Sequence, residues 1–248
     1  MKWPSELIII RHGQSARNVQ KAAAKQTGST ADYSEGVRDQ DTPLTPMGIL
    51  QAEATGRWLA SEYPNFKPGQ DEHTGPSRYQ GIDTMFVSPY LRTRQTAERL
   101  MYGMGYQPKQ VVEERIREIE FGIMDCLTPD GMKAKFPEEV ARRKREGKYW
   151  YRAPGGESRP DVRLRGHSFL GTISRDYQEK TVVVIAHSVV VLALRSLLER
   201  WGEEQYLIVD QEDDVLNCGV TLYRYNYGRK KLVLESYNRT YYKANEGA

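Results

Sequence analysis

Three short runs of apolar, mostly β-branched residues constrain the fold of this chain more than any other feature. They lie in "LIIIRHG" (7–13), "IDTMFVS" (82–88) and "TVVVIAH" (181–187). Continuous apolar runs of this length are typical of strands buried on both faces of a parallel sheet. Helix-like segments separate them along the chain, and this alternation predicts an α/β fold with a mostly parallel sheet covered on both faces.

The segments between these strands carry recognisable helix and turn signals. In "TPLTPMGILQAEATGRWLASEY" (42–63), Thr45 is a good N-cap, Pro46 suits the first turn, and apolar residues recur at helical spacing. Ser88 and Pro89 are predicted to begin a second helix, and "SVVVLALRSLLERW" (188–201) reads as a buried one. Near the end of the chain, "GVTLYRYNYGRKKLVLESYN" (219–238) predicts a hairpin around Asn226–Arg229.

The segment from Gly122 to Glu157 interrupts this alternation. It contains a charged helix-like stretch with "RRKR" at Arg142–Arg145, three consecutive aromatics at Tyr149–Tyr151 and a Pro-Gly-Gly turn. We predict one domain over residues 1–248, with an insertion at about 122–157 over the active-site edge of the sheet. The basic cluster is interpreted as a solvated helix face rather than a binding patch. The aromatics are expected to anchor the insertion, with stacking on a ligand ring as the alternative.

Composition excludes several classes of protein. The chain has 248 residues with 36 Lys+Arg and 33 Asp+Glu, a net charge of +3 that is too slight to indicate nucleic-acid binding. Its two cysteines, Cys126 and Cys218, form neither a disulfide framework nor a cysteine metal site. No signal peptide and no apolar run long enough to span a membrane is present. We therefore expect a soluble, cytoplasmic protein without membrane or nucleic-acid partners.

Chemically distinctive residues follow each of the three predicted strands. Arg11 and His12 end the first, Ser88 ends the second with Arg92 one turn later, and His187 and Ser188 follow the third. Ligands bind beyond the carboxyl ends of strands in open α/β sheets, so these residues are expected to share one rim.

Such a group suits a phosphoryl dianion. Arginine offers paired donors that match phosphate oxygens, and a neutral imidazole is a competent nucleophile. Gly13 would let the backbone approach a ligand, and the helix starting near Ser188 would direct free N–H groups at an anion. Each signal alone is weak, since a single Arg-His-Gly arises by chance and a lone His187 is more often structural. His73 and His167 are interpreted as loop and helix-surface residues, and no spacing supports a metal site.

Several motifs, in the same order along the chain, resemble those of the histidine phosphatase superfamily, which includes the phosphoglycerate mutases. They are "LIIIRHGQSARN", "DTPLTPMGILQA", "VSPYLRTRQTAERL", "RIREIEFG", "PGGES", "VVVIAHSVVV" and "LNCGVTLYRY", which together run from Leu7 to Tyr225. The resemblance implies a three-layer α/β/α sandwich with a mostly parallel central sheet, phosphoglycerate mutase-like.

The resemblance also implies residue roles. His12 would become phosphohistidine, and Glu118 would act as general acid and then base. Arg11, Arg92 and His187, assisted by Asn18 and the backbone at Ser188, would hold the phosphoryl oxygens. "EERIREIE" holds four glutamates and by itself favours a charged surface, so only the resemblance selects Glu118. Neither cofactor nor metal is implied, and we expect His12 to be neutral and His187 to benefit from being cationic.

The motifs favour the phosphatase branch and a small phosphorylated substrate. "REIEFG" resembles that branch, whereas "FGIMDC" departs from the usual tryptophan-glutamate-glycine run and leaves the substrate pocket open. Serine at 188, where glycine is frequent, is expected to cap the helix. Phosphoglycerate mutase-type transfer and a non-catalytic phosphate-binding role remain as alternatives.

Substrate and assembly are less constrained. Residues 19–42 and the insertion are expected to line the entrance. Arg94, Arg142, Arg143 and Lys144 would favour a polyanion if the fold brings them there. The sequence does not indicate an oligomeric state.

Overall fold

The computed structural model describes residues 3–27, 32–33, 37–64, 81–212 and 214–242. In chain order its helices and strands are β1 (Glu6–Arg11), α1 (Ala16–Thr27), η1 (Asp39–Asp41), α2 (Pro46–Glu62), β2 (Thr84–Val87), α3 (Leu91–Met104), β3 (Lys109–Val112), η2 (Glu114–Ile116), η3 (Gly122–Met124), α4 (Pro129–Lys135), α5 (Pro137–Trp150), α6 (Arg159–Asp176), β4 (Thr181–Ala186), α7 (Ser188–Leu198), α8 (Glu203–Glu212), β5 (Val220–Asn226) and β6 (Lys231–Arg239).

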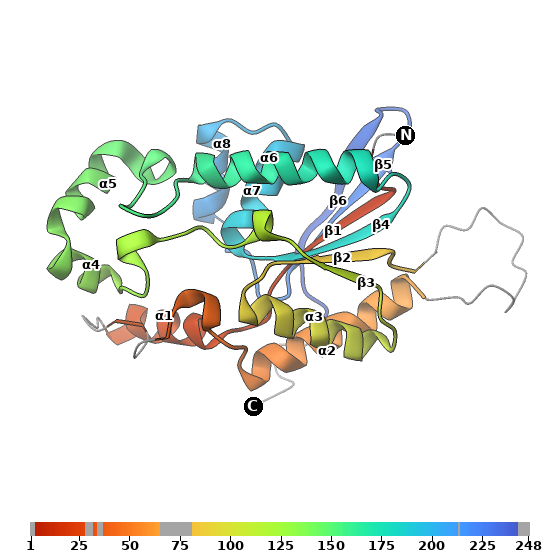
Figure 1. Ribbon diagram of the computed structural model, residues 1–248, viewed down its shortest axis with the longest axis horizontal. Coiled ribbons are helices and arrows are strands. Elements are labelled where there is room, and N and C mark those ends of the chain that lie inside the picture. The colour runs from red at the N-terminus through yellow and green to blue at the C-terminus, as the bar shows by residue number, and fades with distance from the viewer. Residues whose placement is uncertain (1–2, 28–31, 34–36, 65–80, 213, 243–248) are drawn as a thin grey trace, which may run out of the picture.

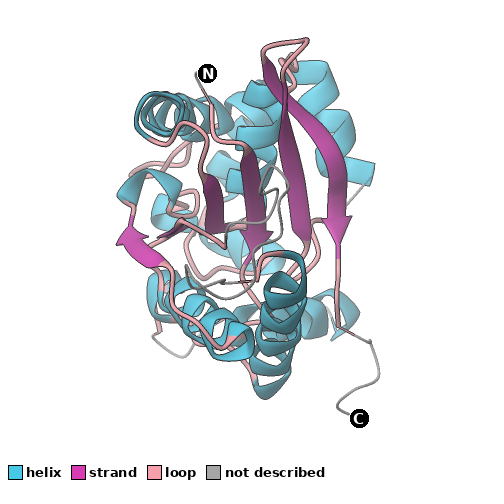
Figure 2. Ribbon diagram, turned by 90° about the vertical axis from the view of Figure 1, so that its right-hand side faces the viewer, coloured by secondary structure: helices cyan, strands magenta, loops and turns pink. Residues whose placement is uncertain are grey.

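A six-stranded sheet with the order β3-β2-β4-β1-β5-β6 forms the centre of the molecule. The first four strands in this order are parallel, and β5 runs antiparallel to both β1 and β6. The β5–β6 hairpin forms one side of the sheet and the short β3 forms the other (Figure 2). The predicted mostly parallel sheet is confirmed, with the antiparallel hairpin at one edge.

Helices cover both faces of this sheet and give three layers (Figure 1). Side chains of β1 and β4 alternate between the two cores, with Leu7 and Ile9 facing α6 and α7 and Ile8 and Ile10 facing α2 and α3. All of these strand residues are fully buried, as continuous apolar runs require. The predicted α/β/α sandwich is therefore confirmed.

The structure confirms the predicted cap of α2 and the predicted hairpin, but not the predicted start of the second helix. Thr45 caps α2 by accepting a hydrogen bond from the Gly48 N–H, and the hairpin turns where predicted. The second helix begins at Leu91 with Tyr90 as its N-cap, so the prediction that Ser88 and Pro89 begin it is wrong. Ser88 instead turns its hydroxyl toward His187.

The segment predicted as an insertion folds into α4 and α5, which lie at the same end of the molecule as α1 (Figure 1). Its aromatics have structural contacts, as expected of an anchor. Tyr149 is buried against Tyr206, and the Tyr151 hydroxyl donates to Glu139 at 2.9 Å. The basic cluster lies on α5 with three of its four members exposed, which confirms the solvated face. The division into one domain plus insertion stays a prediction.

No helix within the described ranges combines the length and apolar character needed to cross a membrane.

Candidate active site

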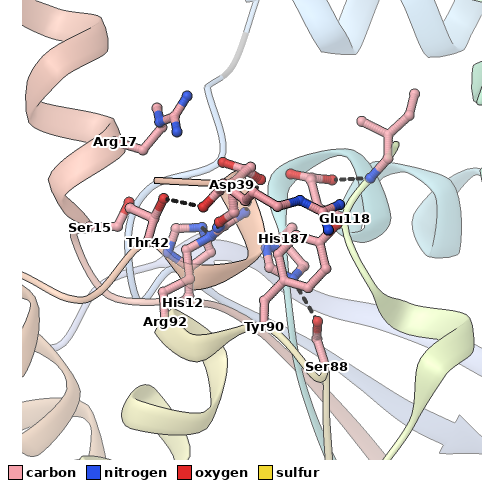
Figure 3. A network of polar contacts seen from close by, with 12 residues as sticks. His12, Ser15, Arg17, Asp39, Thr42, Ser88, Tyr90, Arg92, Glu118 and His187 are labelled. Atoms are coloured by element: carbon pink, nitrogen blue, oxygen red, sulfur yellow. Dashed lines mark hydrogen bonds and ion pairs between the residues drawn. The ribbon is translucent and has the colours of Figure 1, made fainter. Parts of the chain in front are cut away.

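The carboxyl ends of β1, β2 and β4 lie side by side, as their parallel register requires. His12 follows β1, Arg92 lies in the first turn of α3 after β2, and His187 is the N-cap residue of α7 after β4. The ring centroids of the two histidines are 5.3 Å apart. The structure thus brings the three strand ends together as predicted (Figure 3).

The hydrogen bonds of His12 fix its tautomer. Its Nδ1 lies 2.7 Å from the Gly13 carbonyl oxygen, which can only accept, so Nδ1 carries the proton. Its Nε2 accepts from the Nε of Arg92 at 3.2 Å and therefore presents a lone pair. Burial, and then the charges of Arg92 and Arg11, lower the pKa of His12 well below 6.5. His12 is thus neutral at pH 7, as a nucleophile must be.

His187 is fully buried and contacts Ser88, which the sequence places on the same rim without giving it a role. Its Nε2 lies 2.8 Å from the Ser88 hydroxyl, while its Nδ1 has no partner among the described residues. Burial, followed by Arg92 and His12, lowers the pKa of His187 well below 6.5. The ring is therefore neutral in this arrangement, and the charged form needs an anion beside it. The benefit of a cationic His187 during the reaction stays a prediction.

Arg92 is 3% exposed and all of its nitrogen atoms are engaged. Besides the bond to His12, Nη1 donates to the Asp39 carbonyl at 2.5 Å and Nη2 to the Asp39 carboxylate at 2.8 Å. Asp39 lies in η1, 9% exposed. Its carboxylate oxygen accepts from a guanidinium N–H that is equally suited to a phosphate oxygen.

Glu118 lies in the loop between η2 and η3 and is 7% exposed, in contrast to the charged surface that the residues alone favoured. Its Oε1 accepts a hydrogen bond from the Ile119 N–H at 3.0 Å. Burial raises the pKa of Glu118, while Arg92 opposes that shift. A raised pKa keeps the proton available, as a general acid requires.

Three further predicted residues lie at this site. Arg11 donates to the Val215 carbonyl, and its buried Nε has no partner among the described residues. The Asn18 Oδ1 accepts from Ser15 and from Asn217, which leaves the Nδ2 amino group to donate to a ligand. Ser188 is the first residue of α7 and does not cap it, contrary to expectation, because His187 occupies the N-cap position.

Packing against α2 requires a glycine at position 13. A Cβ there would lie 2.5 Å from the carbonyl oxygen of Gly48 at the start of α2. The glycine therefore lets α2 lie against the loop after β1, and the approach of a ligand to its backbone stays a prediction.

A cavity of about 40 Å³ lies between these residues. It is lined by Arg11, His12, Ser15, Arg17, Asn18, Lys21, Asp39, Arg92, Glu118, Phe121 and Ser188. Lys21 and Asp39 belong to the predicted entrance segment 19–42, of which 28–31 and 34–36 lie outside the described residues. Arg17, Asp39 and Phe121 were missed individually, because no local pattern marks them.

The other predicted residues lie elsewhere. Arg94, Arg142, Arg143 and Lys144 are not among the residues that line the cavity, and Arg142 pairs with Glu139. His167 is exposed on α6 as expected, and His73 lies outside the described residues. Across the described ranges, no group of three or more His, Cys, Asp or Glu side chains is arranged to hold a metal ion.

Fold and site define an α/β protein with a histidine–arginine centre at the carboxyl edge of its sheet. A model of the histidine phosphatase superfamily (branch 1) matches residues 76–238, more than half of the chain. The chain therefore belongs to the histidine phosphatase superfamily. The matched range includes Arg92, Glu118 and His187 and begins after His12.

Relatives include both mutases and mutase-like proteins. The phosphoglycerate mutase-like protein AT74 of Arabidopsis thaliana is 29% identical over 217 residues, which cover 82% of this chain and 60% of that protein's length. A 2,3-bisphosphoglycerate-dependent phosphoglycerate mutase of Methylobacterium radiotolerans is 29% identical over 202 residues, covering 80% of this chain and 81% of its own.

Two similar solved structures are described as phosphatases, and their low sequence identity makes them evidence for the fold alone. Mycobacterial glucosyl-3-phosphoglycerate phosphatase has a TM-score of 0.65 and 23% identity, covering 95% of this chain and 100% of that chain. A putative α-ribazole-5'-P phosphatase of Escherichia coli has a TM-score of 0.69 and 17% identity, covering 95% and 97%.

Proposed function

We propose that this protein is a metal-independent phosphomonoester hydrolase that works through a phosphohistidine on His12. The observation that carries the proposal is the environment of His12. Its Nε2 lone pair is set by the Nδ1 bond to Gly13 and lies 3.2 Å from the Arg92 guanidinium, in the cavity that Glu118 also lines. A nucleophile, a fixed positive charge and a buried acid are the groups that phosphoryl transfer needs.

In the first step the His12 Nε2 attacks phosphorus and forms the N–P bond as the ester P–O bond breaks. The leaving alkoxide takes the proton of Glu118, so an alcohol departs and Glu118 becomes a carboxylate. Arg92, Arg11 and the N–H groups at the start of α7 stabilise the equatorial oxygens of the transferring group. A dianion beside His187 raises the pKa of that ring and allows it to donate to the phosphoryl group.

In the second step water attacks the phosphohistidine while Glu118 takes one of its protons. The N–P bond breaks, His12 regains its neutral tautomer, and inorganic phosphate leaves. Glu118 is protonated again, so the cycle closes with one ester and one water consumed. The depressed pKa of His12 and the raised pKa of Glu118 support these two roles, because the shifts run in the directions that each step needs.

Phosphoglycerate mutase-type transfer is the alternative, and the relative from Methylobacterium radiotolerans favours it. Incubation with 3-phosphoglycerate and 2,3-bisphosphoglycerate separates the two activities. Hydrolysis releases inorganic phosphate in proportion to substrate consumed. Rapid isomerisation without phosphate release would overturn the hydrolase proposal.

The direct test is hydrolysis of 4-nitrophenyl phosphate in excess EDTA by the wild type and by His12→Ala. We expect turnover by the wild type and a loss of about 10⁴-fold or more in kcat for the variant, because the nucleophile is removed. His167→Ala is the matched control, since His167 is exposed on α6 away from the site. Equal rates for wild type and His12→Ala would refute the nucleophile. No turnover by folded wild type across phosphomonoesters would favour a non-catalytic phosphate-binding role.

A further inference from the structure

We infer that Arg17 and Lys21 form a second anion site beside the phosphate site, so that the preferred substrate carries a further anionic group, such as a carboxylate, on its alcohol part. Both residues lie on α1 and line the cavity that contains His12 and Arg92. The inference rests on the proposed phosphomonoester hydrolase and names its substrate class.

Arg17 is a buried cation without a matching anion among the described residues. It is 4% exposed, and its Nη2 lies 3.4 Å from the Val37 carbonyl and 3.3 Å from the Cys126 sulfur. Its guanidinium carbon lies 5.6 Å from the centre of the Tyr33 ring, which carries no charge to match it. Its Nε is buried without a hydrogen-bond partner. Burying a guanidinium without a paired carboxylate costs desolvation free energy, and an anionic ligand would offset that cost. Figure 3 places Arg17 on α1, apart from the cluster around His12.

Lys21 follows one turn later and therefore lies on the same face of α1 as Arg17. Its ammonium lies 5.7 Å from the centre of the Phe121 ring. It forms no ion pair with another described residue. Two cations lie on one helix face at the cavity wall. This arrangement is expected for a substrate that carries a second anionic group in addition to its phosphate.

The charges at the cavity leave room for this second anion. Four basic side chains line it, namely those of Arg11, Arg17, Lys21 and Arg92, against the carboxyl groups of Asp39 and Glu118. Asp39 is already paired with Arg92, and Glu118 is protonated when it serves as the acid. With Asp39 charged and Glu118 protonated, the lining side chains carry a net charge of +3, so a phosphate dianion at the sheet edge leaves +1 for one further negative charge. Arg17 and Lys21 then remain for a group on the leaving alcohol, and the planar fork of Arg17 suits a carboxylate.

A purely structural role for Arg17 makes a different prediction. If its side chain only ties α1 to Val37 and Cys126, its loss would disturb the turnover of every substrate equally. A second anion site instead changes the ratio between two substrates that differ in one charge. That ratio is therefore the quantity to measure.

The matched substrates are 3-phosphoglycerate and glycerol 3-phosphate, which differ in a carboxylate against a hydroxymethyl group. For the wild type we expect kcat/KM to favour 3-phosphoglycerate by about tenfold or more, the range of a hydrogen bond to a charged group. Lys21→Gln and Arg17→Gln should each reduce the ratio, and Arg17→Lys should retain part of it. Lys25→Gln removes the same charge from an exposed position on α1 and should leave the ratio unchanged.

Binding of non-hydrolysable analogues keeps this test separate from catalysis. Calorimetry with 4-phosphonobutanoate and butylphosphonate should show the same carboxylate preference in the wild type and its loss in Lys21→Gln, which is exposed and expected to fold. A carboxylate preference without any turnover would overturn the proposed hydrolase but support the second anion site. Equal binding of the two phosphonates by the wild type, or a preference that survives both substitutions, would overturn the second anion site.

Discussion

The carboxyl edge of the sheet and the flank formed by α1 and η1 meet at one cavity, but they are built differently. At the edge, His12, Arg92 and His187 are at most 3% exposed, and each follows a buried strand along the chain. On the flank, Arg17 has contacts of 3.3–3.4 Å and Lys21 is exposed. In the proposed hydrolase the edge would supply chemistry common to every phosphomonoester, whereas the flank would adjust affinity and selectivity.

The largest effect should follow from a change at the edge. Arg92→Met removes the guanidinium that faces His12, and we expect kcat/KM to fall by about 10³ for all phosphomonoesters, as for loss of a preorganised charged donor. Steady-state kinetics checks this, with circular dichroism to confirm folding. Arg94→Met, exposed on the same helix, is the control. A loss below tenfold, or a loss confined to some substrates, would break the distinction between edge and flank.

A change at Glu118 should depend on the leaving group. Glu118→Gln removes the proton donor, so we expect kcat/KM on alkyl phosphates, which reports formation of the phosphoenzyme, to fall by about 10²–10³. The fall in kcat/KM with 4-nitrophenyl phosphate should be much smaller, because that leaving group departs without protonation. Glu114→Gln, in the same glutamate-rich stretch and exposed, should behave as the wild type. Equal losses on both substrates would contradict the role of general acid.

Asp39 lies on the flank but contacts Arg92 at the edge, so its substitution tests how one region affects the other. Its carboxylate is paired with Arg92 at 2.8 Å, and a phosphate dianion would face that negative charge. Asp39→Asn should therefore bind inorganic phosphate about tenfold more tightly, through loss of like-charge repulsion. Calorimetry measures this against Asp41→Asn, an exposed neighbour in the same turn. Weaker binding would mean that Asp39 serves to position Arg92.

The smallest effects should appear in the titration of the two histidines. NMR of ¹³C-labelled histidine should find His12 and His187 neutral at pH 6.5, because burial and then Arg92 lower the pKa of each. Arg92→Met should raise both values, and inorganic phosphate should raise that of His187 in the wild type. Titration that is unchanged by either would contradict the assigned cause.

The same shifts predict how stability depends on pH. Each folded-state histidine pKa lies below that of the unfolded chain, so protonation favours unfolding. The contribution to stability is complete above about pH 6.5 and is lost as the pH falls toward the folded-state values, by at most about 1.4 kcal/mol per histidine per pH unit. Thermal unfolding between pH 7.5 and 5.5 checks the sign.

The edge could be predicted from sequence and the flank could not, for a physical reason. His12 and His187 follow apolar runs whose burial can be predicted from the local sequence. The parallel topology then brings the ends of these strands together. Asp39 reaches Arg92 across 53 residues of chain, and Arg17 reaches Cys126 across 109, so no local pattern marks either contact. Ser88 was mistaken for a helix start because its hydrogen bond to His187 is equally remote in sequence.

Glu118 shows the limit of prediction from residue patterns. Four glutamates in one short stretch are equivalent by periodicity, and only the family resemblance distinguished Glu118. Its burial at 7% and its raised pKa become visible once the loop between η2 and η3 is folded against the sheet edge.

The measurement that tests the central claim most directly is the identification of the covalent intermediate. Protein mixed with a phosphomonoester, quenched under alkaline conditions within one turnover and digested, should give a peptide that carries acid-labile phosphate on His12. The label should be absent from His12→Ala and should accumulate with slow phosphate release in Glu118→Gln. Turnover by the wild type with phosphate on another residue, or with no phosphoenzyme at any time, would contradict the account.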